Sequence, residues 1–476
     1  MNHETAQQSA HCKTTSAAFD RLRLALVILL TVFTAELMLG FHGAFLRVGG
    51  LSVRYLLFAL TFAALYGGAL VLILREKRPL FRGEQSVKGA FDRLDLALFI
   101  LLFATAVWML AIPVLKGTDV RLAIKEAMCM LVLTLAFPLK LFFTFGKLSF
   151  AKAENLVLIL TIALGAAHIL LYVGASVRPT FVESVFRAVL RVFGNTGVMP
   201  AIVSGHGYLR VIFPCSVLLF LGFYFFFAHI AAPRIRDYAV LITSFIAMLF
   251  TVTKALWLGS MAAGGFFFCL LLADAIRRKV WKHVIRFVCV VLCLLLIAVL
   301  LNATLCHGIL AIRMRNTFRL SGTPSDHPDD STTTQKDPLE ELDEQGAVIS
   351  NMTRMEQVKH LLDKWKTSPL IGYGYGSYVE HYLRSTTAKY SYEMTTFAML
   401  MKLGVLGCIF WVVYGVLLAV QAFRKRGMLG GGALCALFGA FFLALNTNPY
   451  LFNFIGMGLL LFLHLSASVP SKEECP

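Results

Sequence analysis

A cation, a glycine–tyrosine stretch and a carboxylate gather between residues 354 and 407, where a polar segment gives way to an apolar one. Arg354 comes first, G-Y-G-Y follows at 372–375, and Glu393 stands directly before the apolar run that begins at 394. A carboxylate can take a proton from a sugar hydroxyl, and a cation can hold an anionic leaving group. This order of residue types predicts a site that grips an anionic headgroup at a membrane surface and carries out proton chemistry there.

Each of these candidates also has a structural interpretation. Gly372, Tyr373, Gly374 and Tyr375 suit glycan binding, because glycine lets the backbone approach a ligand and tyrosine rings can stack on sugars. The same stretch is equally typical of a tight turn, and it matches neither a P-loop nor a dinucleotide fingerprint. Glu393 can be a general base, or an acid that is stabilised by the N-terminal end of a helix dipole. Both interpretations stay open at this stage.

Further cations extend the candidate site. Lys254 lies between two apolar runs, and a lysine at the edge of a membrane is costly unless it reaches water or meets an anion. The segment 177–210 holds four arginines against the single acid Glu183. Each arginine alone is explained by contact with lipid headgroups, but together they predict an anion site. Arg191 and Arg210 are therefore added to the candidates.

The elements that position these residues are membrane helices. The chain has 476 residues, of which 58% are apolar, and its mean hydropathy is +0.74, which predicts a polytopic membrane protein. The net charge of +17 comes from bunched cations, so membrane topology explains it better than nucleic-acid binding does. The ten cysteines contain no C-x-x-C pair, and the acids form no metal-type cluster, so neither a metal nor another cofactor is expected.

Twelve apolar runs predict an all-α fold with about 12 transmembrane helices, since each run can span about 30 Å of hydrocarbon or nearly so. The runs lie at about 22–41, 55–74, 94–115, 122–145, 154–176, 211–230, 237–253, 255–276, 283–304, 394–422, 429–446 and 450–467. Cation clusters at 75–93, 234–236, 277–286 and 424–426 all fall on the side of the N-terminus. The positive-inside rule then predicts that both termini are cytoplasmic.

The same topology divides the chain into four parts. The first nine helices occupy 1–304 and include an outward loop at about 177–210. A large outward segment follows at 305–393, between helices 9 and 10, and helices 10–12 occupy 394–467 before a cytoplasmic tail at 468–476. Within the large segment, polar composition predicts disorder at 321–348, and helical spacing of apolar residues predicts an amphipathic helix at 349–367.

The chain resembles the O-antigen ligase and polymerase superfamily of bacterial membrane glycosyltransferases. The resemblance is strongest over about 350–410, where an arginine precedes P-L-I-G-Y-G and where E-M-T-T-F-A-M-L-M-K-L-G-V-L-G begins at Glu393. T-V-T-K, ending at Lys254, falls where many members have T-x-S-R. Ligases typically have histidine at the position of Glu393 and arginine at that of Lys254. These departures favour the repeat-unit polymerases, with the ligases as the alternative.

The resemblance implies a donor glycan linked through pyrophosphate to undecaprenol, and a glycan or lipid A-core acceptor. It implies direct displacement with inversion at the periplasmic face of the bacterial inner membrane, without a metal. Arg210, Lys254 and Arg354 would hold the pyrophosphate with Arg191 in reserve, Glu393 would be the base, and Tyr373 and Tyr375 would stack on sugars. Membrane lipids and a chain-length regulator are further expected partners.

A transporter or flippase for a polysaccharide lipid is the alternative from a different class. Such proteins show internal repeats and charged or broken segments near the middle of the bilayer. The two halves of this chain show no clear repeat, and its ionisable candidates cluster at one face. The sequence therefore favours an enzyme.

Overall fold

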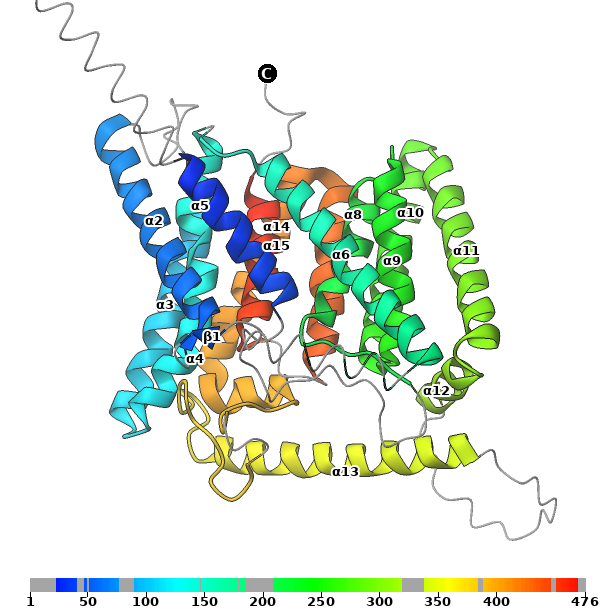
Figure 1. Ribbon diagram of the computed structural model, residues 1–476. Coiled ribbons are helices and arrows are strands. Elements are labelled where there is room, and N and C mark those ends of the chain that lie inside the picture. The colour runs from blue at the N-terminus through cyan, green and yellow to red at the C-terminus, as the bar shows by residue number, and fades with distance from the viewer. Residues whose placement is uncertain are drawn as a thin grey trace, which may run out of the picture.

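The computed structural model describes residues 23–40, 47–48, 51–76, 90–145, 147–178, 180, 182, 184, 188, 209–318, 338–383, 388–446 and 451–469. These residues form an all-α bundle (Figure 1), as the apolar runs predict. Among them, seven helices are long and apolar enough to cross a membrane, and two shorter apolar helices lie at 216–228 and 454–468. The chain is a multi-pass membrane protein.

Each predicted apolar run coincides with helical residues. A helix at 23–39 comes first. The remaining elements, in chain order, are β1 (Arg47–Val48), β2 (Leu51–Ser52), α2 (Val53–Glu76), α3 (Arg93–Leu115), α4 (Val120–Thr134), α5 (Ala136–Thr144), α6 (Phe150–Val177), the 3₁₀ helix η1 (Ser216–Leu219), α8 (Phe220–Ala228), α9 (Ile235–Thr251), α10 (Lys254–Arg278), α11 (Lys282–Thr304), α12 (Ile309–Phe318), α13 (Pro338–Lys366), α14 (Thr395–Leu445) and α15 (Phe454–Ser468). β1 and β2 form a two-residue antiparallel ladder.

Helix α14 accounts for two of the predicted spans. A straight helix of its 51 residues would be about 76 Å long, more than twice the hydrocarbon thickness. The backbone leaves the helical region at Gly427, with φ 66° and ψ −171°. A Cβ placed on Gly415 would lie 3.6 Å from the ring of Phe438, so the parts before and after Gly427 pack side by side. The chain therefore reverses at Gly427.

The sixth span begins later than the sequence predicts. Helical structure starts at Ser216 rather than at residue 211, because Pro214 has no N–H to donate and disfavours helical geometry in the residue before it. Residues 209–213 are not helical. There, the Val211 N–H donates to the Phe250 carbonyl oxygen at the end of α9, 3.0 Å away. Arg210 therefore precedes a non-helical segment and not a helix.

The cation clusters meet at one end of the bundle, which we call the cation face. Lys425 lies 3.3 Å from Asp92 at the start of α3, and Arg426 lies 3.4 Å from Glu154 near the start of α6. Arg236 donates to Asn155 over 2.6 Å, and Arg286 donates to the Ala231 carbonyl oxygen over 3.0 Å. These contacts join the four cation-bearing connections and confirm that they lie on the same side.

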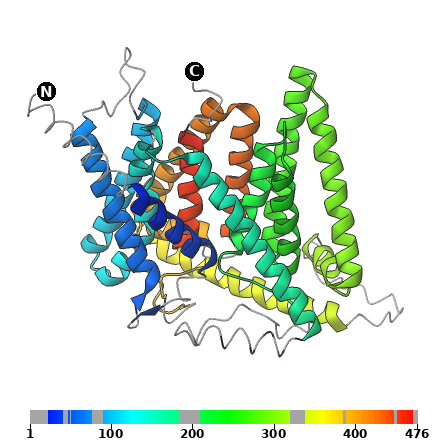
Figure 2. The ribbon, with the colours of Figure 1, turned by 45° about the horizontal axis from the view of Figure 1, so that its top comes forward.

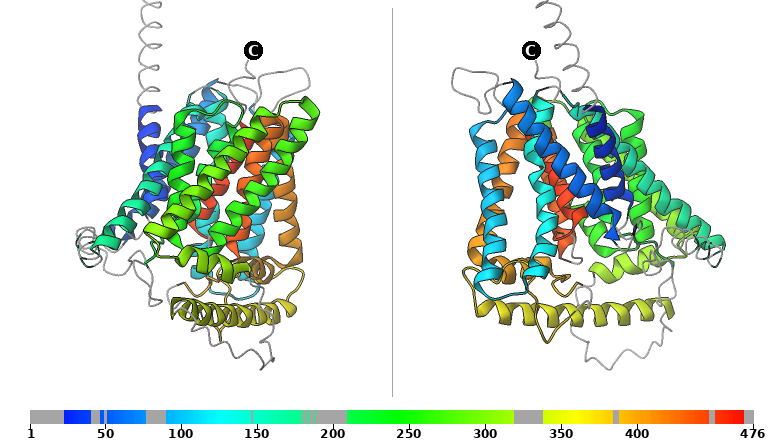
Figure 3. Two further views of the ribbon diagram at one scale, coloured as in Figure 1. Left: turned by 90° about the vertical axis from the view of Figure 1, so that its right-hand side faces the viewer. Right: turned by 60° about the vertical axis from the view of Figure 1, so that its left-hand side comes forward.

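Helix α13 runs across the opposite end of the bundle, which we call the α13 face (Figures 1 and 3). It begins at Pro338, whereas the sequence predicts disorder through 348 and a helix only from 349. The structure thus continues the helix backwards through the acidic stretch that starts with P-L-E-E-L-D-E, whose leucines sit at helical spacing. Residues 321–337, the remainder of the predicted disordered stretch, lie outside the described residues.

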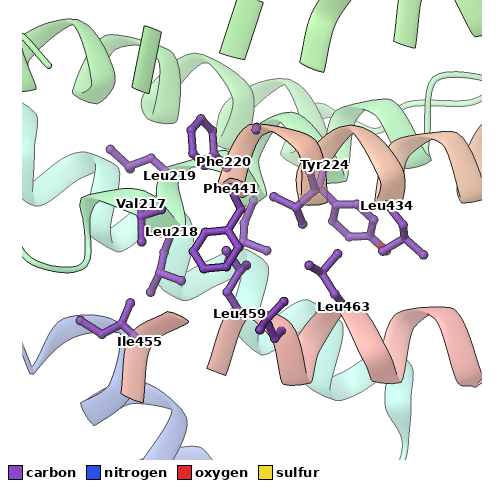
Figure 4. Close-up of a cluster of buried hydrophobic side chains, with 14 of the residues drawn as sticks. Val217, Leu218, Leu219, Phe220, Tyr224, Leu434, Phe441, Ile455, Leu459 and Leu463 are labelled. Atoms are coloured by element: carbon purple, nitrogen blue, oxygen red, sulfur yellow. The ribbon is translucent and has the colours of Figure 1, made fainter. Parts of the chain in front are cut away.

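Aromatic and aliphatic side chains fill the centre of the bundle. Every residue of α8 from Phe220 to Phe227 is buried, and Figure 4 shows this helix facing Phe441 of α14 and Leu459 and Leu463 of α15. At the edge of the bundle, α11 (Figure 2) exposes most of its apolar side chains, among them Leu292 at 60% and Val299 at 65%. A surface of this kind suits contact with lipid.

Close helix packing at Gly259 gives a test of this arrangement. A Cβ at Gly259 would lie 2.9 Å from the Ala440 carbonyl oxygen of α14, whereas one at Gly264 would meet nothing within 4 Å. Gly259→Ala should therefore lower stability by about 1–3 kcal/mol, the usual cost of overpacking. Gly264→Ala, in the same helix, should leave it unchanged or raise it. Thermal unfolding of the detergent-purified protein measures both, and equal effects would contradict the packing.

Candidate functional site

Arg354 and Glu393 come together on the α13 face. The guanidinium Nε of Arg354 lies 3.5 Å from Oε2 of Glu393, and the two side chains are 32% and 19% exposed. Arg354 projects from the middle of α13, while Glu393 stands just before the start of α14. The sequence predicts both residues as parts of one site, and the structure brings them into contact across a separation of 39 positions.

Helix α13 is fixed over the start of α14 by a buried glutamine. The Oε1 of Gln357, one turn after Arg354, accepts a hydrogen bond from the Met394 N–H over 2.8 Å, and Gln357 is only 1% exposed. Leu361 of α13 packs in the same cluster as Ala398 and Met401 of α14. Gln357 thus holds the backbone next to Glu393, and with it the distance between Glu393 and Arg354.

The segment 369–376 is docked into a break in α14. At Gly404 the backbone has φ 63° and ψ −177°, so the helical hydrogen-bond pattern is interrupted there. The N–H groups of Val405 and Leu406 donate instead to the carbonyl oxygens of Pro369 and Leu370, over 2.9 and 3.1 Å. In return, the Lys402 carbonyl oxygen accepts from the N–H groups at positions 373 and 374. The docked segment thereby replaces the interrupted helical bonds of α14.

Three glycines allow this docking, and each lies against a different helix. Gly372, Gly374 and Gly376 have φ of 67°, 75° and 74°, a region that residues with a Cβ rarely adopt. A Cβ would lie 2.4 Å from the Lys402 carbonyl oxygen of α14 at the first position, 2.2 Å from Pro113 of α3 at the second, and 2.4 Å from an α4 backbone nitrogen at the third. The glycine–tyrosine stretch is therefore a structural turn set among three helices.

The two tyrosines of the stretch have different environments. Tyr375 is 1% exposed, its ring meets Phe452 edge-on at 5.9 Å between centroids, and burial raises the pKa of its hydroxyl well above the usual range. Its ring is therefore not available to stack on a sugar in this conformation, contrary to the sequence-based assignment. Tyr373 is only half-buried, and Lys116 and Lys364 lie 5.3 and 5.0 Å from its ring centroid.

A buried ion pair lies directly beneath the docked segment. Nζ of Lys402 in α14 donates to Oε1 of Glu126 in α4, and both side chains are at most 1% exposed. The other carboxylate oxygen of Glu126 accepts from the Gly376 N–H over 2.7 Å. Lys402 also donates to the Tyr390 carbonyl oxygen over 2.8 Å. The pair thus joins two membrane helices to both ends of the loop that leads to Glu393.

Sequence reasoning missed Gln357, Glu126 and Lys402 as members of this region. Glu126 and Lys402 stand in apolar runs, and a charge in such a run signals a partner elsewhere in the bundle. The sequence does not show which residue pairs with Glu126, because its partner Lys402 is 276 positions away. Gln357 carries no comparable signal, because a glutamine on an amphipathic helix usually faces water.

The remaining cations form a second group on the same face. Lys254 is the first residue of α10, and Val252 before it adopts a left-handed conformation with φ 49°, which turns the chain sharply between α9 and α10. Arg210 lies close to this turn in the fold, because the N–H of its neighbour Val211 donates a hydrogen bond to the Phe250 carbonyl oxygen at the end of α9. Arg191 lies outside the described residues.

The end of α14 connects the Arg354–Glu393 pair with the second group, Lys254 and Arg210. α10 packs along the second half of α14, as the approach of Gly259 to Ala440 shows. Asn446, which follows α14, accepts a hydrogen bond from the Thr396 hydroxyl over 2.6 Å, three residues after Glu393. Of the residues that the sequence singles out, the α13 face therefore carries the carboxylate Glu393 and the cations Arg354, Lys254 and Arg210, a set that can accept a proton and stabilise an anion.

Removal of one partner of the buried pair should be far more damaging than removal of both. Lys402→Met leaves the Glu126 carboxylate without its counter-charge, and breaking a buried pair in this way typically costs about 3–5 kcal/mol. The double variant Glu126→Gln/Lys402→Met should recover much of that loss, since no unpaired charge remains. Thermal unfolding of the purified variants measures the difference. If the double variant lost as much stability as the sum of the losses from Glu126→Gln and Lys402→Met alone, direct pairing of the two side chains would be contradicted.

Comparison with known proteins gives one match. Residues 239–412, from α9 to the first half of α14, match the family model described as O-Antigen ligase. Neither the comparison with curated proteins nor that with solved structures found a match. The matched region contains Lys254, Arg354 and Glu393, the docked glycine segment and the break at Gly404. This match over residues 239–412 supports membership of the chain in the O-antigen ligase/polymerase superfamily, and a function of that general type.

Proposed function

We propose that the chain is a glycosyltransferase that polymerises undecaprenyl-pyrophosphate-linked oligosaccharide repeat units at the periplasmic face of the inner membrane. The contact between Arg354 and Glu393 at 3.5 Å is the observation that carries the proposal. It pairs a proton acceptor with a cation at the start of a membrane helix, inside the region that matches the family. A lipid-linked substrate in the bilayer can reach such a place with its headgroup.

The charge distribution supports the periplasmic placement of this site. The joined cation clusters lie at one end of the bundle and Arg354 with Glu393 at the other. By the positive-inside rule the cation face is cytoplasmic. Arg23, which lines a cavity together with Lys152 at the start of α6, and Ser468, whose carbonyl oxygen accepts from Lys425 over 2.9 Å, both lie at that face. We therefore place both termini in the cytoplasm.

In the proposed reaction, the acceptor hydroxyl oxygen attacks the anomeric carbon of the donor sugar. The bond between that carbon and the pyrophosphate oxygen breaks, and the configuration inverts. Glu393 takes the proton of the attacking hydroxyl, and undecaprenyl pyrophosphate leaves with its added negative charge. Arg354, Arg210 and Lys254 stabilise that charge. A guanidinium has five N–H donors, so the contact of Arg354 through Nε leaves donors for the pyrophosphate.

Ligation is the second candidate, since the matched family model is described as O-Antigen ligase. In that case the same carboxylate and cations would move a finished glycan to a lipid A-core or protein acceptor. Glu393 and Lys254, which stand where ligases typically have histidine and arginine, favour polymerisation.

Replacement of the proposed base tests the chemistry. Glu393→Gln keeps the shape but cannot accept a proton, so transfer should fall by about 10²–10⁴-fold, the usual range for loss of a general base. Glu393→Asp should retain part of the activity. Transfer is measured with purified protein in liposomes that contain lipid-linked donor and acceptor.

Glu356→Gln is the matched control, because Glu356 lies on α13 near Arg354 with a side chain 62% exposed and should not affect the rate. Full activity in Glu393→Gln with normal folding would exclude Glu393 as the base.

Deletion of the gene in its source organism separates polymerase from ligase. Loss of a polymerase should leave single repeat units on the lipid A-core, since ligation still proceeds. Loss of a ligase should leave polymer on the undecaprenyl carrier and none on the lipid A-core. The banding of extracted lipopolysaccharide on a gel reads out this difference, and polymer stranded on the carrier would overturn the polymerase proposal.

A further inference from the structure

A cavity of about 320 Å³ lies between the helix at 23–39, α4–α5, α6 and α15. Most of its lining is apolar, with Leu30, Leu139, Val157 and Leu461 among the contributing residues. Its volume falls at the lower end of the range of about 300–1,000 Å³ typical of small-molecule sites. Its place in the fold is far from the candidate catalytic site, because its lining includes the first turns of α6 at the cation face.

The rim of the cavity is basic. Arg23 and Lys152 both line it, both are exposed, and neither makes an ion pair within the part of the chain that the structure describes. The one acid in the lining, Glu154, lies 3.4 Å from Arg426, so its charge is offset by a residue outside the cavity. Two cations therefore remain at the edge of an apolar space.

The helices around the cavity also expose apolar side chains beside it. Val27, which lines the cavity, is 42% exposed, and its neighbour Ile28 is 55% exposed. In a membrane protein such side chains face hydrocarbon. An acyl chain can therefore enter the cavity from the bilayer while its headgroup stays at the basic rim.

We propose that this cavity binds a phospholipid with an anionic headgroup, drawn from the leaflet at the cation face. Its phosphate contacts Arg23 and Lys152, and part of an acyl chain fills the apolar space between α6 and α15. Basic pockets between membrane helices on this side of a membrane suit such headgroups. The proposed glycan donor does not account for the two cations, because its pyrophosphate belongs at the α13 face. The lipid site is thus separate from the proposed reaction.

Lipid binding to the full-length protein tests the proposal. The detergent-purified chain is titrated with phosphatidylglycerol or with phosphatidylcholine of matched acyl chains, and bound lipid is counted by native mass spectrometry. Phosphatidylglycerol should bind more tightly. Arg23→Gln/Lys152→Gln should weaken its binding by about 30-fold, the factor expected for the loss of two cations near an anionic headgroup, and should leave phosphatidylcholine unchanged.

Two further variants separate the site from general charge effects. Lys282→Gln/Arg424→Gln removes two exposed cations of the same face that do not line the cavity, and it should bind phosphatidylglycerol as the parent does. Val157→Phe fills the apolar space without a change of charge and should weaken binding as well. Variants are compared only where size-exclusion profile and unfolding temperature match those of the parent.

Three results would overturn the proposal. One is equal affinity for the two lipids, which would show an adventitious apolar surface. Another is an equal loss in Lys282→Gln/Arg424→Gln, which would show only the general field of the cation face. The last is an affinity of Val157→Phe for phosphatidylglycerol equal to that of the parent, which would show that no acyl chain enters the cavity.

Discussion

The break of α14 at Gly404 and the ion pair beneath it are the constraint on which the α13 face depends. Once the helix is interrupted, its free N–H groups and carbonyl oxygens need partners inside the bundle, since unbonded backbone groups are costly there. The segment 369–376 supplies them. The charge of Lys402 needs its own partner for the same reason, and Glu126 provides it. These requirements fix the conformation of residues 369–376.

That conformation places the candidate catalytic group. Before the loop, residues 369–376 are bonded to α14 and, through Gly376, to Glu126. After the loop, the Tyr390 carbonyl oxygen accepts a hydrogen bond from Lys402. Glu393 follows at once, and Gln357 ties the next backbone N–H to α13. A general base must be held within hydrogen-bond reach of its substrate to be effective. The buried polar contacts supply that rigidity, while the carboxylate of Glu393 stays partly exposed.

The two ends of the bundle have different physical characters. At the cation face, Lys425, Arg426 and Arg286 are paired with acids or with backbone carbonyl oxygens. Asp92 shows the effect: burial opposes its ionisation, yet the Asp95 N–H and Lys425 lower the pKa of its carboxyl to about 2. At the α13 face, Arg354 and Glu393 remain partly exposed. Paired charges thus join the connections at the cation face, although other cations there, such as Arg23 and Lys152, stay exposed, whereas the pair at the α13 face lies at the proposed substrate site.

The sequence by itself determined the all-α fold and the common side of the cation clusters, because hydrocarbon thickness and the cost of buried charge act on local composition. It also predicted Arg354 and Glu393 as one site, from the order of residue types and from the resemblance to a family. Only the tertiary structure showed that the glycine–tyrosine stretch is a docked turn with Tyr375 buried, and that Glu126 pairs with Lys402. These features depend on contacts between residues far apart in the chain, such as the close approach of Gly372, Gly374 and Gly376 to three helices, and no local pattern encodes them.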